Sequence, residues 1–203
     1  MNGYPHNHVC ILDGMALVQM IKPSGMTYAS LADELLKAVL ARKKTAVKTD
    51  VVFDVYRENS IKNAERVTRS SGKVAISNII PTSPVYQWHQ FLSLSSNKTL
   101  LIQFVVNQWS KNHYFLTVEK QVFYATVGDT CFEISRYGKT EVERLQCHQE
   151  EADTRMFFHL VHGVRVSQRF VIHTPDTDVF ILAVAVSEQQ GKSIYIKTGN
   201  VFL

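Results

Sequence analysis

The residues of this chain best able to do chemistry are carboxylates that follow apolar runs. Asp13 ends the run HVCILD, Asp54 ends DVVFD, and Asp176 ends RFVIHTPD. A second group opens the amphipathic stretch QEEADTRMFFHLVHG and consists of Glu150, Glu151 and Asp153. Clustered carboxylates repel one another unless cations neutralise them, and oxygen ligands suit hard ions such as Mg²⁺ or Mn²⁺. Two such ions roughly 3.5–4 Å apart can activate water and stabilise the leaving oxygen in phosphodiester cleavage.

The elements that must position these carboxylates alternate between apolar and amphipathic runs, which predicts βα units and an α/β fold. Strands are expected at 8–13, 50–54 and 169–176, and a helix at 29–44 that Ser30 or Thr27 would cap. In an open parallel sheet, ligands bind beyond the carboxyl ends of the strands. We therefore expect Asp13, Asp54 and Asp176 at one edge. A helix beginning near Gln149 would add its own carboxylates if it crosses over to the strand at 169–176.

Helix capping is the alternative explanation of these acidic residues. An aspartate after a strand is often an N-cap, and the helix dipole favours acidic residues in a first turn. Asp13, Asp176 and Glu151 could each be explained in this way. Capping does not account for Asp176 together with Asp178, nor for Asp54, because the following VYRENS does not begin as an obvious helix. The joint pattern favours a site.

Four segments, taken in order, resemble the motifs of the 5′-nuclease and flap endonuclease branch of the PIN-like nucleases. They are ILDGMALVQ, VVFDVYRENSIKNAERVTR, QEEADTRMFF and TPDTDVFIL. The sequences HQEEADTR and TPDTDVF also resemble those of uncharacterised proteins associated with mobile elements. The resemblance implies a PIN-like three-layer fold, with a central, mostly parallel sheet flanked by helices. It implies two Mg²⁺ or Mn²⁺ ions, held by Asp13, Asp54, Glu151, Asp153, Asp176 and Asp178.

The second motif continues into a basic segment. In flap endonucleases a lysine and an arginine seven positions apart approach the scissile phosphate, and Lys62 and Arg69 keep this separation. They lie one residue further from the aspartate than in the family. The resemblance implies that Lys62 and Arg69 are catalytic and that Arg66 joins them in binding the substrate. Thr154 stands where bacterial members often carry another aspartate.

Residues 71–146 are expected to form an insertion of helices and a hairpin, the latter turning at Gly128 and Asp129. In flap endonucleases this region holds an arch that clamps single-stranded nucleic acid. The alternative is that these elements pack and complete the sheet, because apolar residues dominate over basic ones. Trp88, Trp109 and Tyr114 could likewise stack on bases or be buried.

Composition sets further limits. A formal charge of +4 allows a polyanionic partner without requiring one. The three cysteines form no CxxC pair, and the histidines show no HExxH spacing, so neither a disulfide framework nor a zinc site is indicated. No apolar segment is long enough to span a membrane. We expect an intracellular protein of the nucleus or cytoplasm. Its expected partner is DNA or RNA, and we expect no association with a membrane.

Two functions follow from these patterns. The first is a metal-dependent nuclease that cuts DNA or RNA, and the second is a catalytically silent nucleic-acid-binding or assembly module of transposon-derived origin. Flap endonucleases carry another aspartate after the fourth motif, and residues 1–203 end before one appears. The resemblance therefore implies a single, C-terminally truncated domain that holds its second ion weakly.

Overall fold

The computed structural model describes residues 5–43, 45–57, 75–111, 122–198 and 201–202. The predicted basic residues Lys62, Arg66 and Arg69, and the aromatic Tyr114, lie outside these ranges. All the predicted carboxylate ligands lie within them.

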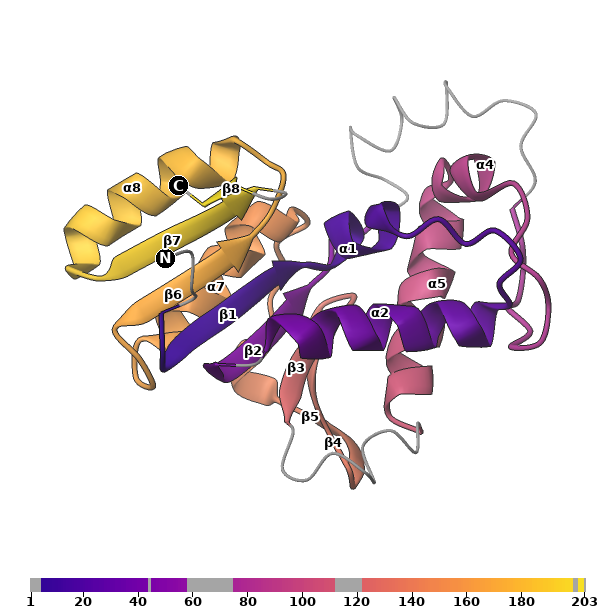
Figure 1. Ribbon diagram of the computed structural model, residues 1–203, viewed down its shortest axis with the longest axis horizontal. Coiled ribbons are helices and arrows are strands. Elements are labelled where there is room, and N and C mark those ends of the chain that lie inside the picture. Colours follow the sequence, from indigo (N-terminus) through magenta and orange to yellow (C-terminus); the bar gives the residue numbers. More distant parts are fainter. Residues whose placement is uncertain (1–4, 44, 58–74, 112–121, 199–200, 203) are drawn as a thin grey trace.

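A mixed sheet forms the centre of the molecule (Figure 1), and its strand order is β5-β4-β3-β2-β1-β6-β7-β8. The five consecutive strands from β3 to β7 in this order run parallel, and the outer pairs are antiparallel. This confirms the predicted α/β class with a mostly parallel sheet. The strands are β1 (His8–Asp13), β2 (Ala46–Val52), β3 (Phe123–Val127), β4 (Thr130–Ser135), β5 (Gly138–Glu141), β6 (Arg169–His173), β7 (Ser193–Thr198) and β8 (Val201–Phe202).

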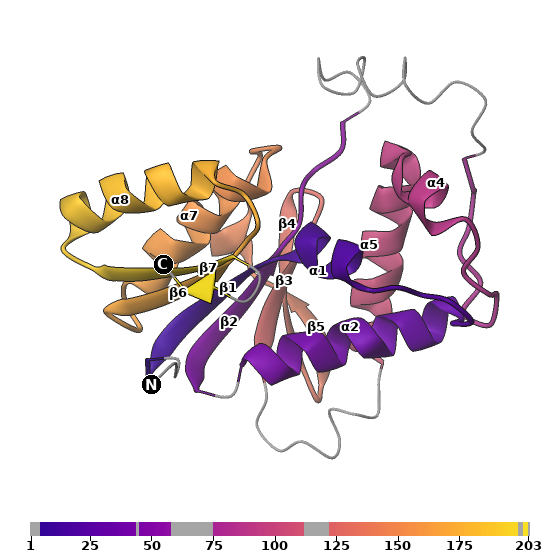
Figure 2. The same cartoon turned by 45° about the horizontal axis from the view of Figure 1, so that its top comes forward.

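Helices cover both faces of this sheet, as Figures 1 and 2 show. One face carries α1 (Gly14–Met20), α2 (Tyr28–Arg42) and α5 (Ser95–Trp109), and the other carries α7 (Ala152–Gly163) and α8 (Asp178–Gln190). Two further short helices lie in the described ranges, α4 (Trp88–Leu92) and the 3₁₀ turn η1 (Glu143–Leu145). No helix in the described ranges is long and apolar enough to cross a bilayer.

Alternation along β1 explains why two cores form. Side chains of successive strand residues point to opposite faces. Cys10 and Leu12 therefore pack with α1, α2 and α5, while Val9 and Ile11 pack with α7 and α8. All four side chains are fully buried. The strand that carries Asp13 is thus packed on both faces.

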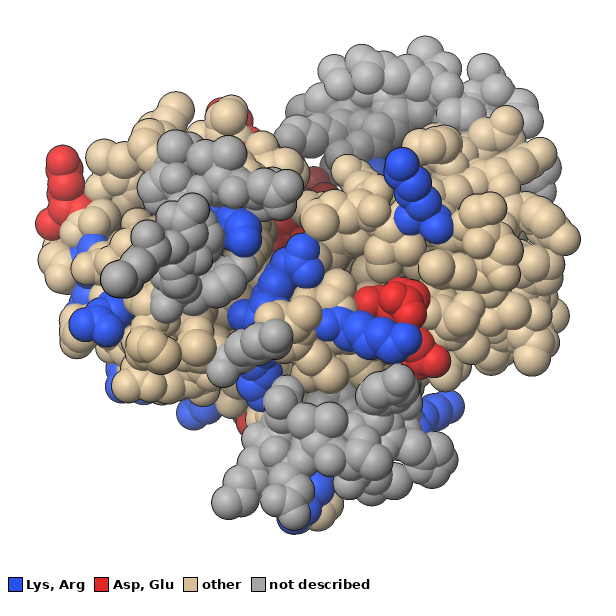
Figure 3. All heavy atoms as spheres, viewed as in Figure 1, with Lys and Arg blue, Asp and Glu red and all other residues tan. Residues whose placement is uncertain are grey.

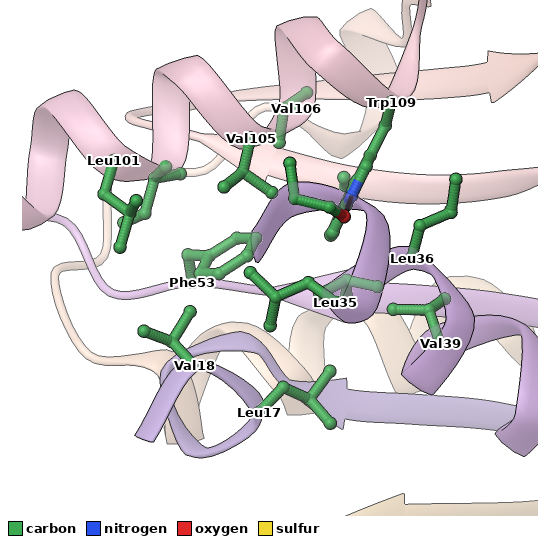
Figure 4. Close-up of a cluster of buried hydrophobic side chains, with 14 of the residues drawn as sticks. Leu17, Val18, Leu35, Leu36, Val39, Phe53, Leu101, Val105, Val106 and Trp109 are labelled. Atoms are coloured by element: carbon green, nitrogen blue, oxygen red, sulfur yellow. Dashed lines mark hydrogen bonds between the residues drawn. The ribbon is translucent and has the colours of Figure 1, made fainter. Parts of the chain in front are cut away.

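The larger core joins α5 to α2 (Figure 4). Trp109 is 1% exposed, its ring meets Phe123 edge to face at 5.5 Å, and its Nε1 donates to the Ala32 carbonyl over 2.9 Å. A base-stacking role for Trp109 is therefore wrong, because both its ring and its donor are used inside the protein. Leu101 and Val105 of α5 lie in the same core.

The first two motifs pack so closely that position 14 has room only for glycine. A Cβ added to Gly14 would lie 2.4 Å from the ring of Phe53. Phe53 is 2% exposed, and its ring lies among Val18, Leu35 and Val105 in Figure 4. The Asp-Gly pair of the first motif thus lets the residue before Asp54 pack directly beside the residue after Asp13.

The predicted elements are confirmed with shifted ends. The 29–44 helix is α2, which begins after Thr27 with a capping box to Ser30. The second predicted strand ends at Val52 rather than at Asp54, and the helix expected from Gln149 begins at Ala152. The β3–β4 hairpin turns at Gly128 and Asp129 as expected.

Candidate functional site

Register places the carboxyl ends of three neighbouring strands together. In β1, Asp13 lies opposite Val52 of β2, and Leu12 lies opposite His173 of β6. Asp54 and Asp176 follow in the loops just beyond these strands. The first, second and fourth motifs therefore meet at one edge of the sheet, as the predicted topology requires.

Thr174 joins the first motif to the fourth. Its Oγ1 donates to Oδ2 of Asp13 over 3.5 Å and accepts from the backbone N–H of Asp176 over 3.1 Å. Asp176 Oδ1 in turn accepts from the N–H of Asp178, the first residue of α8. The side chain of Thr174 is buried, whereas Asp176 and Asp178 are exposed. The threonine links Asp13 to the backbone of the loop that carries Asp176, and nothing in the sequence patterns had singled it out.

The second motif is joined to the third by a pair of hydrogen bonds. The N–H of Ala152 donates to Oδ1 of Asp54 over 2.9 Å, and the N–H of Val55 donates to the Glu150 carbonyl over 2.8 Å. Asp54 therefore caps α7 from a distant part of the chain. This capping brings the predicted ligands Glu151 and Asp153, at the start of α7, to the same edge.

Asp54 is close enough to Asp13 to contribute to the raised pKa of the Asp13 carboxyl. Burial raises the pKa of Asp13 to about 6, and the neighbouring Asp54 contributes to the rise, against the opposing hydrogen bond from the N–H of Ala16. An aspartate that gives up its proton this reluctantly is one that a nearby cation would strongly favour in its charged form. Of the possible ligand pairs, this one has the clearest electrostatic contact.

Arg155 is a cation of this region that the sequence patterns did not reveal. It lies on α7, is fully buried, and donates from Nη2 to the carbonyl of Gly128 over 2.8 Å. Its Nε and Nη1 make no hydrogen bond within the described residues. Burial lowers the pKa of Arg155, and Asp129 and Asp54 are among the groups that oppose this. The guanidinium therefore offsets part of the negative charge of Asp54.

An exposed network holds the loop before α7. Arg57 donates to Asp129 over 3.0 Å and to the carbonyl of His148 over 3.1 Å, and Nδ1 of His148 lies 2.8 Å from Asp129. The Nε of Arg57 also lies 3.7 Å from Glu150. The hairpin turn, the segment after Asp54 and the start of α7 are thereby tied together. Glu150 thus pairs with an arginine.

The oxygen atoms at this edge of the sheet are of the type that binds hard cations, but among the described residues they are not arranged around a common point. Carboxylate and hydroxyl oxygens are the ligands that Mg²⁺ and Mn²⁺ prefer. In the part of the chain that the structure describes, no three acidic, histidine or cysteine side chains are arranged to hold a metal ion. Asp13, Asp54 and Asp176 each cap a helix N-terminus instead. A carboxylate has about four lone-pair sites, so one capping bond leaves the same group able to bind a cation.

One histidine of α7, His159, belongs to a different network. His159 Nδ1 lies 2.9 Å from Oδ1 of Asp50, and Lys48 Nζ donates to the same carboxylate. The side chains of His159 and Asp50 are fully buried. Both partners stabilise the ionised carboxylate of Asp50, so its pKa is lowered despite its burial. This network joins α7 to β2 beneath the candidate site.

A pocket of about 260 Å³ opens beside Asp13 on the face that carries α1. Arg42, His173 and Lys197 contribute to its wall. Burial lowers the pKa of His173 to about 3, and Arg42 and Lys197 add to this, so both cations lie near the same imidazole. Figure 3 shows blue Lys and Arg side chains gathered near the centre of this face, next to red acidic ones in a recess.

Comparisons with protein-family models, with curated proteins and with solved structures found no match for this chain. The likeness to flap endonucleases therefore depends on the four motifs and on the edge of the sheet where their described parts meet.

Proposed function

We propose that this chain is a PIN-like nuclease that uses Mg²⁺ or Mn²⁺ to hydrolyse phosphodiester bonds in DNA or RNA. The observation that supports it best is the meeting of Asp13 and Asp54, two carboxylates from different motifs; burial raises the pKa of Asp13, and the nearby Asp54 adds to the rise. Thr174 links Asp13 to the backbone of Asp176, and Asp54 caps the start of α7, where Glu151 and Asp153 lie; these links support including the third and fourth motifs in the site. A bound ion would supply the activation of a water nucleophile.

The proposed roles divide between charge and positioning. Asp13, Asp54, Glu151 and Asp153 hold one ion directly or through water, and Asp176 and Asp178 hold the second. Lys62 and Arg69 steady the scissile phosphate, with Arg66 on the same basic segment. Arg155 acts indirectly, by limiting the repulsion among these carboxylates in the absence of a cation. An intracellular location agrees with three free cysteines, all of them buried.

The second candidate function, a catalytically silent nucleic-acid-binding or assembly module, is favoured by one specific observation. Each of the three strand-end aspartates already has a structural task in capping a helix. In a silent module these caps are sufficient reason for the aspartates to be present, and cations should add little stability.

Thermal melting with and without millimolar Mn²⁺ separates the two candidates. A ligand that binds only the folded state raises the melting temperature, by an amount set by its concentration relative to Kd. For a nuclease we expect Mn²⁺ to raise the melting temperature of the parent chain by several degrees, and to have a much smaller effect on Asp176→Asn. The substitution keeps an oxygen that can accept from the N–H of Asp178, so the start of α8 is preserved. Equal Mn²⁺ shifts in both proteins, or none in either, would favour the silent module.

A further inference from the structure

The pocket beside Asp13 combines a small volume with two cationic side chains. Its volume of about 260 Å³ is below the roughly 300–1,000 Å³ typical of pockets for drug-sized ligands. It can therefore accept a single small group, and a nucleic-acid strand cannot pass through it. The wall also has apolar surface, which a site for a purely ionic ligand would not need. This surface comes from Leu17, Met20 and Pro175.

The cations come from separate elements. Arg42 is the last residue of α2, and one of its guanidinium nitrogens, Nη1, donates to the carbonyl of Ala38 over 2.9 Å. That bond uses one of five N–H donors and fixes the group at the pocket wall. Lys197 lies on β7, opposite His173 of β6 in the parallel register. Two positively charged side chains from different elements thus border one pocket, which is the charge that an anion prefers.

We propose that this pocket binds the terminal phosphate monoester of a nucleic-acid strand and so sets where the strand is cut. A monoester carries a charge of about −1.5 to −2 at pH 7, which matches Arg42 and Lys197, whereas an internal diester carries only one. The apolar wall accommodates the sugar of the terminal nucleotide. Because Asp13 borders the same pocket, a strand anchored there lies with its first linkages at the carboxylate cluster.

Asp13 makes the binding of anion and cation interdependent. Its carboxylate repels a phosphate in the pocket unless a divalent ion neutralises it. Phosphate and Mn²⁺ should therefore strengthen one another's binding, and thermodynamic linkage requires the same factor in both directions. The identity of the anion as the end of a nucleic-acid strand rests on the proposed nuclease function. The presence of an anion site does not.

Calorimetric titrations in millimolar Mn²⁺ test the pocket with defined probes. The probes are inorganic phosphate, adenosine 5′-monophosphate, adenosine 3′-monophosphate and adenosine. We expect the monoesters to bind and adenosine not to bind, and the stronger of the two nucleotides identifies which strand end is recognised. Lys197→Gln and Arg42→Gln should each weaken the monoester roughly ten- to hundredfold, the range for losing one hydrogen bond to a charged group. Lys197→Arg should retain most of the affinity because it keeps the cation.

The matched control is Lys37→Gln, which removes an exposed cation from the same helix as Arg42. It should leave the affinity for the monoester unchanged. Circular dichroism of each variant confirms folding, and the charge-preserving Lys197→Arg keeps the test decisive if Arg42→Gln unfolds the end of α2. Binding of adenosine as tight as that of the monoesters, or full affinity in Lys197→Gln, would overturn the proposal.

Cleavage assays distinguish failure of the pocket from failure of the nuclease. Labelled strands with a 5′-phosphate, a 3′-phosphate or only hydroxyl ends are compared in Mn²⁺. A chain that binds the monoester through Lys197 but cuts no strand would keep the anion site and refute the nuclease. A chain that cuts all the strands equally, and binds no monoester, would keep the nuclease and refute the pocket.

Discussion

Asp13 shows how burial and a neighbouring carboxylate together change the pKa of a residue in the candidate site. Its Oδ1 caps α1, its Oδ2 accepts from Thr174, and Asp54 lies close enough to influence its charge. Because burial is the largest contribution, folding makes ionisation of this side chain less favourable than it is in the unfolded chain. A bound cation would reverse that preference, so the same residue that weakens the chain without metal would stabilise it with metal.

The first prediction follows from the sign of that shift. The pKa of Asp13 is raised from 3.8 to about 6, so its contribution to stability is fully present below pH 3.8 and is lost as the pH rises through 6. Asp13→Asn removes the unfavourable charge and retains an acceptor for the N–H of Ala16. It should therefore exceed the parent in free energy of unfolding by about 1–3 kcal/mol at pH 7 without metal.

Urea unfolding of both proteins between pH 4 and pH 7 provides the measurement. The pKa of His173 is lowered from 6.5 to about 3, so this histidine also makes stability depend on pH in this window, but it is present in both proteins and the difference between them isolates Asp13. The advantage of Asp13→Asn should shrink toward pH 4. A difference that stays constant with pH would contradict the coupling of Asp13 to its surroundings.

Gly14 carries a second prediction at this scale. An alanine there would place its Cβ 2.4 Å from the Phe53 ring, and overpacking of this kind costs about 1–3 kcal/mol. Phe53→Leu makes room, so the double variant should lose less stability than the sum of the two single ones. A double-mutant cycle by urea unfolding gives the coupling. Strict additivity would show that the ring and the glycine do not limit one another.

At the scale of elements, the position of α7 decides whether the third motif reaches the site. Asp54 caps its start, Arg57 ties down the loop before it, and the buried network of Lys48, Asp50 and His159 joins its middle to β2. Each contact comes from a residue distant in sequence. The helix is thus placed by polar contacts as well as by its apolar stripe.

Asp50→Asn tests the buried network. It leaves the ammonium of Lys48 buried without its counter-charge, and breaking such a pair typically costs about 3–5 kcal/mol. The control is Glu34→Gln, which breaks the exposed pair with Lys37 and should cost less than about 1 kcal/mol. Chemical denaturation of both variants provides the comparison. A loss below 1 kcal/mol for Asp50→Asn would mean that apolar packing alone holds α7 against β2.

Local patterns predicted the elements well where local physics decides them. Apolar alternation revealed β1 and β6, the Thr27 cap revealed the start of α2, and Gly128 with Asp129 revealed the hairpin turn. The contacts that unite the site are not local. Thr174, Arg155 and the capping of α7 by Asp54 link residues that only the folded sheet brings together, and no periodicity encodes them.

Trp109 and Asp50 illustrate the same limit for burial. A tryptophan in an amphipathic stretch suits either a base-stacking surface or a core, and the docking of α5 on α2 decided for the core. Asp50 begins the predicted strand DVVFD and could equally have been exposed, but its partners lie on the same strand and on α7. Which face of a strand is covered depends on the whole arrangement of helices.

On the scale of the whole molecule, three neighbouring strands of the parallel part of the sheet, β2, β1 and β6, end at the edge where Asp13, Asp54 and Asp176 lie, and helices pack on both faces of that sheet. The acidic cluster and the basic pocket adjoin at Asp13. A cation would bind on one side of this aspartate and a phosphate on the other, which is the charge arrangement that phosphodiester hydrolysis needs.

The most direct measurement is cleavage of labelled single-stranded, duplex and flap-bearing DNA and RNA in millimolar Mn²⁺, by the parent chain and by Asp54→Asn. Asparagine still offers an oxygen to the N–H of Ala152, so α7 keeps its cap while the charge beside Asp13 is lost. We predict Mn²⁺-dependent cleavage of at least one substrate by the parent, and at least a hundredfold slower cleavage by a folded Asp54→Asn, as expected when a metal ligand of the reaction is lost. Equal cleavage by both proteins, or no cleavage of any substrate by the parent, would contradict the account.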